Sequence, residues 1–221
     1  MKTMTAFALL SLCAACQSTS MSLRPGSTEG KVAQQQFDLI KSLAGSWTTT
    51  STMEEMPGTL EVRYRVVGGG SVVEEDFMPG HPHEMISMYH MDNGRLMMTH
   101  YCAVGNQPRM TAEPCSALDE DCPELRFRFR DCTNLASAND GHMREMDMTI
   151  VDRDTFSSKW TFFKDGKADH SAKFRWTRAS TPNAKTVIIN GDEVVVAPAA
   201  GDAPAIPPRV TRFSKTIFGV F

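Results

Sequence analysis

A dense group of polar side chains between residues 83 and 109 is the part of this sequence best equipped for chemistry. It combines imidazoles, a carboxylate, phenols, a thiol, an amide and a guanidinium. The members are His83, Glu84, Tyr89, His100, Tyr101, Cys102, Asn106 and Arg109. Such groups bind a small molecule when a few of them converge in an apolar pocket. We take them, together with His142 and Trp160, as the candidate ligand-binding residues.

An Asn93-Gly94 pair predicts how the two strands that carry this group face each other. Asn-Gly between two strand-like runs is a strong hairpin signal, and a two-residue turn places Ser87 opposite His100. Parity then puts on one face His83, Met85, Ser87, Tyr89, Met98, His100 and Cys102. The opposite face carries Glu84, Ile86, Met88, His90, Met97, Thr99 and Tyr101. Because both faces are mixed, the sequence leaves open which one points inward.

Metal binding requires three or four side chains that converge on one ion. The best set here is His83, His100 and His142, with His170 as a further weak candidate. No HExxH motif supports such a site, and the preferred interpretation is a group of histidines that hydrogen-bond to their neighbours and to the loop backbone.

Nucleophilic and acid-base catalysis have little support in the sequence. There is no Gly-x-Ser-x-Gly motif, and the paired carboxylates Glu54-Glu55 and Glu74-Glu75 are interpreted as solvated charge. We therefore assign no catalytic residue and favour a protein that is not an enzyme.

The periodicity predicts the elements that position these residues. A helical stripe runs from Ala33 to Ala44, and after it the apolar period changes to two, as in residues 59–67. About eight short strands follow, separated by Gly, Asn-Gly and Asp-Gly turns. This pattern predicts an all-β, antiparallel up-and-down barrel with a short N-terminal helix, and a two-sheet sandwich is the alternative.

The first residues have the layout of an export signal. Lys2 is followed by the short apolar run 6–12 and then by "CAACQS", in which Ala14-Ala15-Cys16 resembles the lipobox of bacterial lipoproteins. We therefore expect lipidation at Cys16 and an exported protein, anchored to a bacterial membrane and facing the periplasm or the cell surface. The alternative is plain secretion.

The net charge of -3 and the interleaved charges argue against a nucleic-acid partner.

Four cysteines follow Cys16, and an even number in an exported chain favours disulfides. Cys115 and Cys122 flank a polar loop and are the predicted pair, with a zinc site as the alternative. The states of Cys102 and Cys132 stay open.

The expected domain division is a signal at 1–16, a tether at 17–30, the barrel at 31–178 and a tail at 179–221, in which "KTVIINGDEVVV" is a second hairpin candidate.

Several segments resemble a family of uncharacterised bacterial lipocalin-like proteins within the calycin and nitrobindin-like barrels. They are "FMPGHPHEMISMYHMDNGRLMMTHYCAVGNQPRM", "DCTNLAS", "GHM" and the strand around Trp160, and the resemblance covers roughly residues 36–178. It implies the barrel fold. In nitrobindin-like barrels a late histidine ligates haem iron, a role that the resemblance would give to His170, whereas the residues around it predict a surface histidine.

The leading hypothesis is an envelope lipoprotein that holds a small apolar or amphipathic ligand in its barrel. The alternatives are a haem- or metal-binding barrel with enzymatic activity, and an envelope spacer or interaction module. We further expect Arg109 to fold over the mouth of the barrel from an ordered loop and to pair with a carboxylate, for which Glu84 is the nearest candidate, or with a ligand anion.

Overall fold

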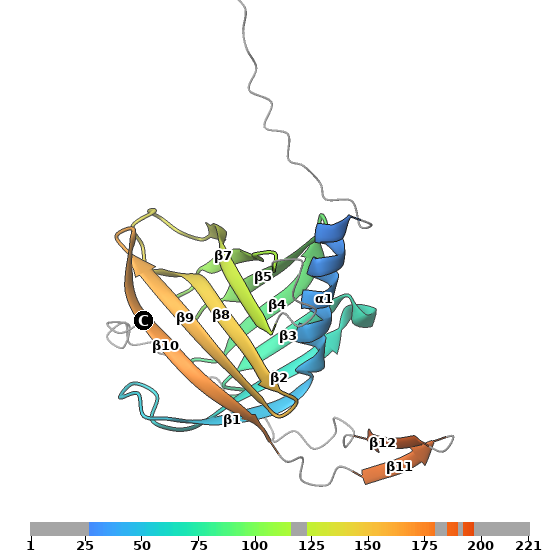
Figure 1. Ribbon diagram of the computed structural model, residues 1–221. Coiled ribbons are helices and arrows are strands. Elements are labelled where there is room, and N and C mark those ends of the chain that lie inside the picture. The colour runs from blue at the N-terminus through green and yellow to red at the C-terminus, as the bar shows by residue number, and fades with distance from the viewer. Residues whose placement is uncertain (1–26, 116–122, 180–184, 190–191, 197–221) are drawn as a thin grey trace, which may run out of the picture.

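The computed structural model describes residues 27–115, 123–179, 185–189 and 192–196 of the chain. Ten antiparallel strands form a closed barrel in which each strand pairs with its neighbours in the chain and β1 pairs with β10 (Figure 1). The strands are β1 (Gly45–Ser51), β2 (Gly58–Val67), β3 (Val72–Phe77), β4 (Met85–Asp92), β5 (Arg95–Tyr101), β6 (Gln107–Ala112), β7 (Glu124–Thr133), β8 (His142–Asp152), β9 (Thr155–Lys164) and β10 (Lys167–Arg178). The predicted up-and-down barrel is confirmed.

One helix, α1 (Thr28–Ser42), precedes the barrel, and a single 3-10 turn, η1 (Gly68–Gly70), joins β2 to β3. The side chain of Ser27 caps α1 by accepting a hydrogen bond from the amide of Gly30 at 3.1 Å, so the helix begins inside the segment expected to be a tether. Its apolar stripe is buried in the barrel core through Phe37 and Ile40. Because α1 packs against β2, β4 and β5, it covers the end of the barrel at which β2 ends and β5 begins.

The register of β4 and β5 decides which face of the hairpin points inward. Ser87 lies opposite His100 and Met91 opposite Leu96, as the Asn93-Gly94 turn predicts. Ser87, Tyr89, Met98 and His100 are all buried in the barrel, whereas Tyr101 is exposed on the outer face. The interior is therefore the face that carries His100.

The structure has two more barrel strands than the approximate eight that the sequence predicts, and β6 is the clearest omission. Residues 107–112 were expected to be a loop, and Pro108 within them argues against a strand. The strand nevertheless pairs with β5 and β7, with a bulge between Arg109 and Met110.

The C-terminal hairpin predicted around Asn190-Gly191 is confirmed, because β11 (Lys185–Ile189) pairs antiparallel with β12 (Asp192–Val196). Among the described residues no helix is both long and apolar enough to cross a membrane.

The seam that closes the barrel is short. Trp47 lies opposite Arg178 and Thr48 opposite Thr177. Arg178 adds side-chain contacts across this seam: its guanidinium lies 4.0 Å from the ring of Trp47 and donates to the carbonyl oxygen of Ala44 at 2.9 Å. The first and last strands are therefore joined by one side chain as well as by the ladder.

Candidate ligand-binding site

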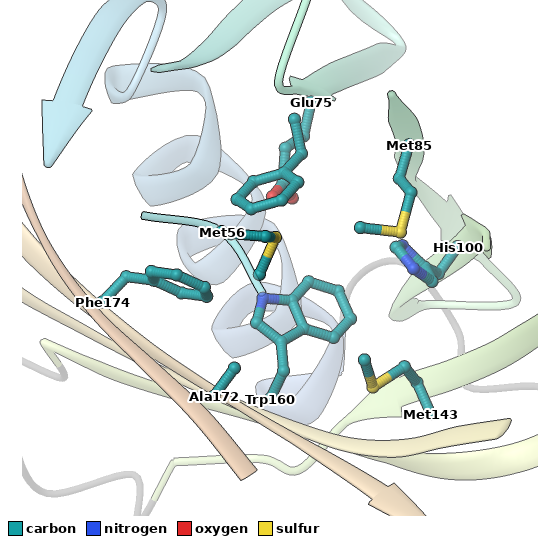
Figure 2. Close-up of a pocket in the computed structure, with 9 residues that line it drawn as sticks. Met56, Glu75, Met85, His100, Met143, Trp160, Ala172 and Phe174 are labelled. Atoms are coloured by element: carbon teal, nitrogen blue, oxygen red, sulfur yellow. The ribbon is translucent and has the colours of Figure 1, made fainter. Parts of the chain in front are cut away.

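A small cavity lies inside the barrel at the end opposite α1. Its volume is about 30 Å³, and most of its wall is apolar or aromatic (Figure 2). The lining residues are Met56, Glu75, Phe77, Met85, His100, Met143, Trp160, Ala172 and Phe174. They come from the β1–β2 loop and from the ends of β3, β4, β5 and β8, with β9 and β10 completing the wall.

Two polar side chains, Glu75 and His100, interrupt this apolar wall. Glu75 alternates with Val73 and Phe77 on β3, so strand parity directs its carboxylate inward, while Glu74 points outward and binds Arg65. Glu75 is 5% exposed. The interpretation of Glu74-Glu75 as solvated charge is therefore wrong for Glu75.

Hydroxyl groups surround the carboxylate of Glu75 at the core side of the cavity. Tyr89 donates a hydrogen bond to it, and the nearby hydroxyl groups of Tyr64 and Ser87 also favour its charged form. Burial raises the pKa of Glu75 to about 7, although these hydrogen bonds act in the opposite direction. Burial and the nearby Glu75 also raise the pKa of both tyrosines well above the ordinary value, so both phenols stay protonated donors.

Ser87 connects Glu75 to His100. The Ser87 hydroxyl lies 3.0 Å from Nδ1 of His100, and the imidazole ring lies 4.8 Å from the ring of Trp160. Burial lowers the pKa of His100 to about 4, so the ring is neutral at ordinary pH. Its Nε2 atom is buried and has no hydrogen-bond partner among the described residues.

The charge state of Glu75 determines what the cavity presents. An ionised carboxylate only accepts hydrogen bonds, so Glu75 is then the charged acceptor of the lining. The Ser87 hydroxyl and Nδ1 of His100 share one hydrogen bond, and its direction follows from which nitrogen of the neutral ring carries the proton.

The structure brings three of the sequence candidates to the interior near this site: Tyr89, His100 and Trp160. Cys102 is also buried, just beyond the end of β5, and burial raises the pKa of its thiol. Tyr101 is 49% exposed on the outer face. Glu84 is exposed in the loop before β4, where it accepts a hydrogen bond from the amide of Gly80.

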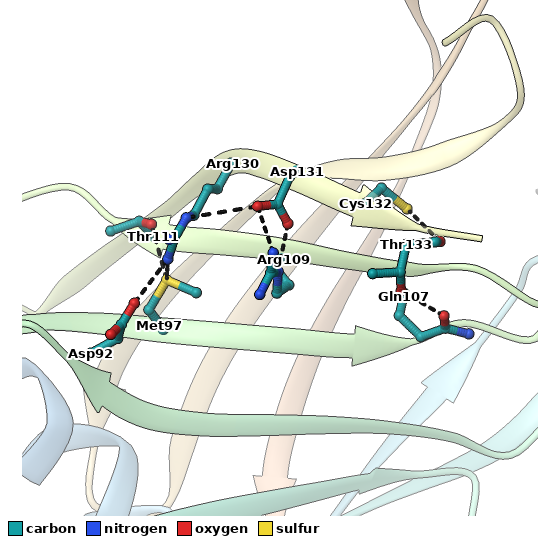
Figure 3. A network of polar contacts seen from close by, with 9 residues as sticks. All are labelled: Asp92, Met97, Gln107, Arg109, Thr111, Arg130, Asp131, Cys132 and Thr133. Atoms are coloured by element: carbon teal, nitrogen blue, oxygen red, sulfur yellow. Dashed lines mark hydrogen bonds and ion pairs between the residues drawn. The ribbon is translucent and has the colours of Figure 1, made fainter. Parts of the chain in front are cut away.

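Arg109 lies on β6, not in a loop over the barrel mouth. It pairs with a carboxylate as expected, but the partner is Asp131 and not the candidate Glu84. Its guanidinium makes two hydrogen bonds to Asp131 on β7, at 2.5 and 2.7 Å (Figure 3). Arg130 lies 3.8 Å from the same carboxylate and also binds Asp92. The bulge at Arg109 aligns it with Asp131, a register shift that the sequence pattern does not reveal.

The remaining candidates lie in or beside the loops. His142 is buried against Phe129, with ring centroids 5.0 Å apart, and its Nδ1 lies 2.7 Å from the carbonyl oxygen of Asp140. The amide of Asn106 donates to the carbonyl oxygen of Gly141 at 2.8 Å. His83 is half-buried in the β3–β4 loop, and its ring centroid lies 5.6 Å from that of His81. These residues stabilise loops and do not line the cavity.

The histidines do not form a metal site in the described part of the chain. There, no three His, Cys, Asp or Glu side chains lie close enough together to hold a metal ion. His170 stacks on Phe162 with ring centroids 5.0 Å apart and is held by Asp169 at 2.8 Å. A porphyrin is much larger than the cavity of about 30 Å³, so the residues that line this cavity do not fit a haem.

Sequence reasoning missed Glu75, Tyr64, Met56 and Met143 near the cavity. The alternation of Val73, Glu75 and Phe77 was a usable signal for Glu75, because a carboxylate on an apolar face has to be buried or paired. Met56 gives no such signal, because it lies in a loop between β1 and β2.

Comparison with known proteins adds no assignment: no protein-family model matches the sequence, and a search of curated proteins finds no match.

Cys102 and Cys132 are free cysteines. Cys122 lies outside the described residues, as do Cys16 and the export signal, so the Cys115–Cys122 disulfide and lipidation stay predictions.

Proposed function

We propose that this chain is an exported, lipid-anchored barrel protein that binds a small apolar or amphipathic molecule at the barrel end opposite α1. The observation that carries the proposal is a largely apolar cavity lined by Glu75 and by His100, whose buried Nε2 atom has no hydrogen-bond partner among the described residues. A buried polar atom without a hydrogen bond is costly, so a ligand that supplies the missing bond gains affinity there. The closed up-and-down barrel is compatible with the resemblance to lipocalin-like barrels.

The cavity holds one or two water molecules at its present volume of about 30 Å³. An organic ligand must therefore displace side chains, and three of the lining side chains are methionines, Met56, Met85 and Met143 (Figure 2). Methionine has three rotatable bonds and adapts its shape at low cost. A ligand would place its polar group in the existing cavity and its apolar part in space vacated by methionine side chains.

Native mass spectrometry of protein purified from its own membrane tests the proposal. A bound small molecule is expected in the wild-type protein, and its binding should quench the fluorescence of Trp160, which lines the cavity. Trp160→Phe should remove this quenching. Trp47→Phe, a matched change at a fully buried tryptophan outside the cavity lining, should retain it. A barrel that carries no molecule and shows no quenching with any amphiphile contradicts the proposal.

The small cavity favours a second candidate, an envelope spacer or interaction module whose barrel is simply filled. That function predicts crosslinked protein partners and no ligand in the experiment above.

The lipid anchor is tested by a separate experiment. Incorporation of labelled palmitate should require Cys16 and be lost in Cys16→Ser.

A further inference from the structure

The charge pattern of the barrel interior restricts the ligand. Among the described residues Glu75 is the only buried carboxylate, and neither lysine nor arginine is buried. Neither lysine nor arginine lines the cavity, and the one imidazole there, His100, is neutral because burial lowers its pKa. A ligand carboxylate would find no cation there and would face the carboxylate of Glu75, so an anionic amphiphile is disfavoured.

The geometry points to a primary alkylammonium ion as the ligand, with its ammonium group bound by the buried carboxylate of Glu75. This inference rests on the proposed function and names the chemical class that the same site takes. An ammonium group has three hydrogen-bond donors and no acceptor, which matches a cavity lined by a carboxylate. It is close to a water molecule in size and therefore fits the existing space.

The aromatic wall supports a cationic head group. Phe77, Trp160 and Phe174 line the cavity together with Glu75 (Figure 2). The face of an aromatic ring attracts a cation, and this attraction strengthens where water is excluded. An alcohol would satisfy one acceptor and gain neither this attraction nor the charge pairing with Glu75.

The hydrogen bonds around Glu75 tie binding to pH. Its carboxyl group is faced by Tyr64 on β2, by Ser87 and Tyr89 on β4, and, through Ser87, by His100 on β5. Asp76, its neighbour on β3, further raises its pKa. Because the pKa of Glu75 is about 7, an ammonium ion must displace a proton from Glu75 in acid but not in base. Ammonium binding should therefore strengthen as the pH rises through about 7.

Calorimetric titration with hexylamine, hexanol and hexanoate at about pH 8 compares three head groups on one tail. We expect hexylammonium to bind at least about tenfold more tightly than hexanol, and hexanoate to bind most weakly. At about pH 6 hexylammonium should bind about tenfold more weakly, while hexanol should change little. Binding of hexanol or hexanoate without a preference for the amine overturns this inference and leaves the proposed function standing. Absence of binding by all three overturns both.

Two variants locate the binding group. Glu75→Gln should reduce hexylammonium affinity at least about tenfold at about pH 8 and remove its pH dependence, with little effect on hexanol. Glu84→Gln makes the same chemical change in an exposed loop at the same end of the barrel and should leave all three affinities unchanged. Equal losses in the two variants would indicate a general effect of surface charge and overturn the inference. Retention of the amine preference in a folded Glu75→Gln protein would also overturn it.

Discussion

Glu75 and His100 are two ionisable groups whose burial shifts their pKa values in opposite directions. Burial raises the pKa of Glu75 from 4.5 to about 7 and lowers that of His100 from 6.5 to about 4. The stability that Glu75 contributes is present below pH 4.5 and is lost as the pH rises to about 7. The contribution of His100 is present above pH 6.5 and is lost as the pH falls to about 4.

The two contributions oppose each other between pH 4.5 and 6.5, so removing either group should expose the other. In Glu75→Gln, the free energy of unfolding should fall as the pH is lowered from 6.5 to about 4, because folded His100 resists protonation. In His100→Asn, which keeps a donor near Ser87, it should fall as the pH rises from 4.5 to about 7. Each change should be on the order of 3 kcal/mol. Urea unfolding at a series of pH values measures both.

The exposed carboxylate variant Glu84→Gln is the control and should retain the wild-type pH profile. If Glu75→Gln and His100→Asn lose stability in the same direction of pH, the opposed pKa shifts are wrong.

The sequence predicts part of this site and misses the rest for a physical reason. Strand parity and one turn suffice to place Ser87 opposite His100, because a two-residue hairpin fixes the register. Glu75 lies on another strand, and its contact with Tyr89 depends on the pairing of β3 with β4. The connection between β3 and β4 is a loop of several residues and not a two-residue turn, so the sequence alone does not fix the register of this pair.

At the scale of elements, the same limitation explains β6. Its residues 107–112 alternate in burial like any strand, but Pro108 and the bulge at Arg109 hide the pattern. The long β4–β5 hairpin, by contrast, has a strong turn and clean parity and is predicted correctly. Local chemistry therefore predicts the hairpins, while the irregular strand depends on its neighbours.

The Arg109–Asp131 pair between β6 and β7 should contribute little to stability. Its side chains are 41% and 42% exposed, and exposed ion pairs contribute about 1 kcal/mol or less because water and salt screen them. A double-mutant cycle of Arg109→Ala and Asp131→Ala should give a coupling free energy of about 0.5–1 kcal/mol. Ligand affinity should be unchanged, because Arg109 does not line the cavity. A coupling several times larger, or loss of ligand, would restore a role for Arg109 in the site.

Helix α1 closes its end of the barrel through a few fully buried side chains. Ile40 is 0% exposed and belongs to the core shared by the helix and the strands. Ile40→Ala should reduce the free energy of unfolding by about 2–5 kcal/mol, because it removes buried methyl groups and leaves a cavity. Leu39→Ala is the matched control, since Leu39 is only partly buried, and it should cost less than half as much. Equal losses in thermal unfolding would show that α1 does not seal the barrel through Ile40.

At the scale of the whole molecule, the two ends of the barrel have different roles. The helix seals one end with apolar side chains, and the other end contains the cavity with its buried acceptors. Buried polar groups reduce the stability of a core. The strand pairing around the rest of the barrel therefore has to supply the stability that holds the cavity side chains in place. The β1–β10 seam is the place where that closure depends on the fewest residues.

Arg178 joins the seam, the helix and the β8–β9 turn. Besides Ala44, its guanidinium donates to the carbonyl oxygens of Ser42, at the C-terminal end of α1, and of Arg153. Carbonyl groups at the end of a helix carry partial negative charge and favour a cation. The same guanidinium covers the ring of Trp47, so one side chain connects three segments that are distant in the sequence.

Arg178→Ala should therefore reduce the free energy of unfolding by about 2–3 kcal/mol, through lost hydrogen bonds to carbonyl groups and lost contact with Trp47. That corresponds to a fall of roughly 5–10 °C in Tm for a barrel of this size. Arg178→Lys should recover less than half of the loss, because one ammonium group cannot span three carbonyl groups. Arg175→Ala, an exposed position on the same strand, should change stability by less than about 0.5 kcal/mol. Hydrogen exchange should localise the damage: in Arg178→Ala the amides of β1 and β10 should exchange faster while those of β4 and β5 keep their protection, whereas uniform loss of protection would contradict a role confined to closing the seam.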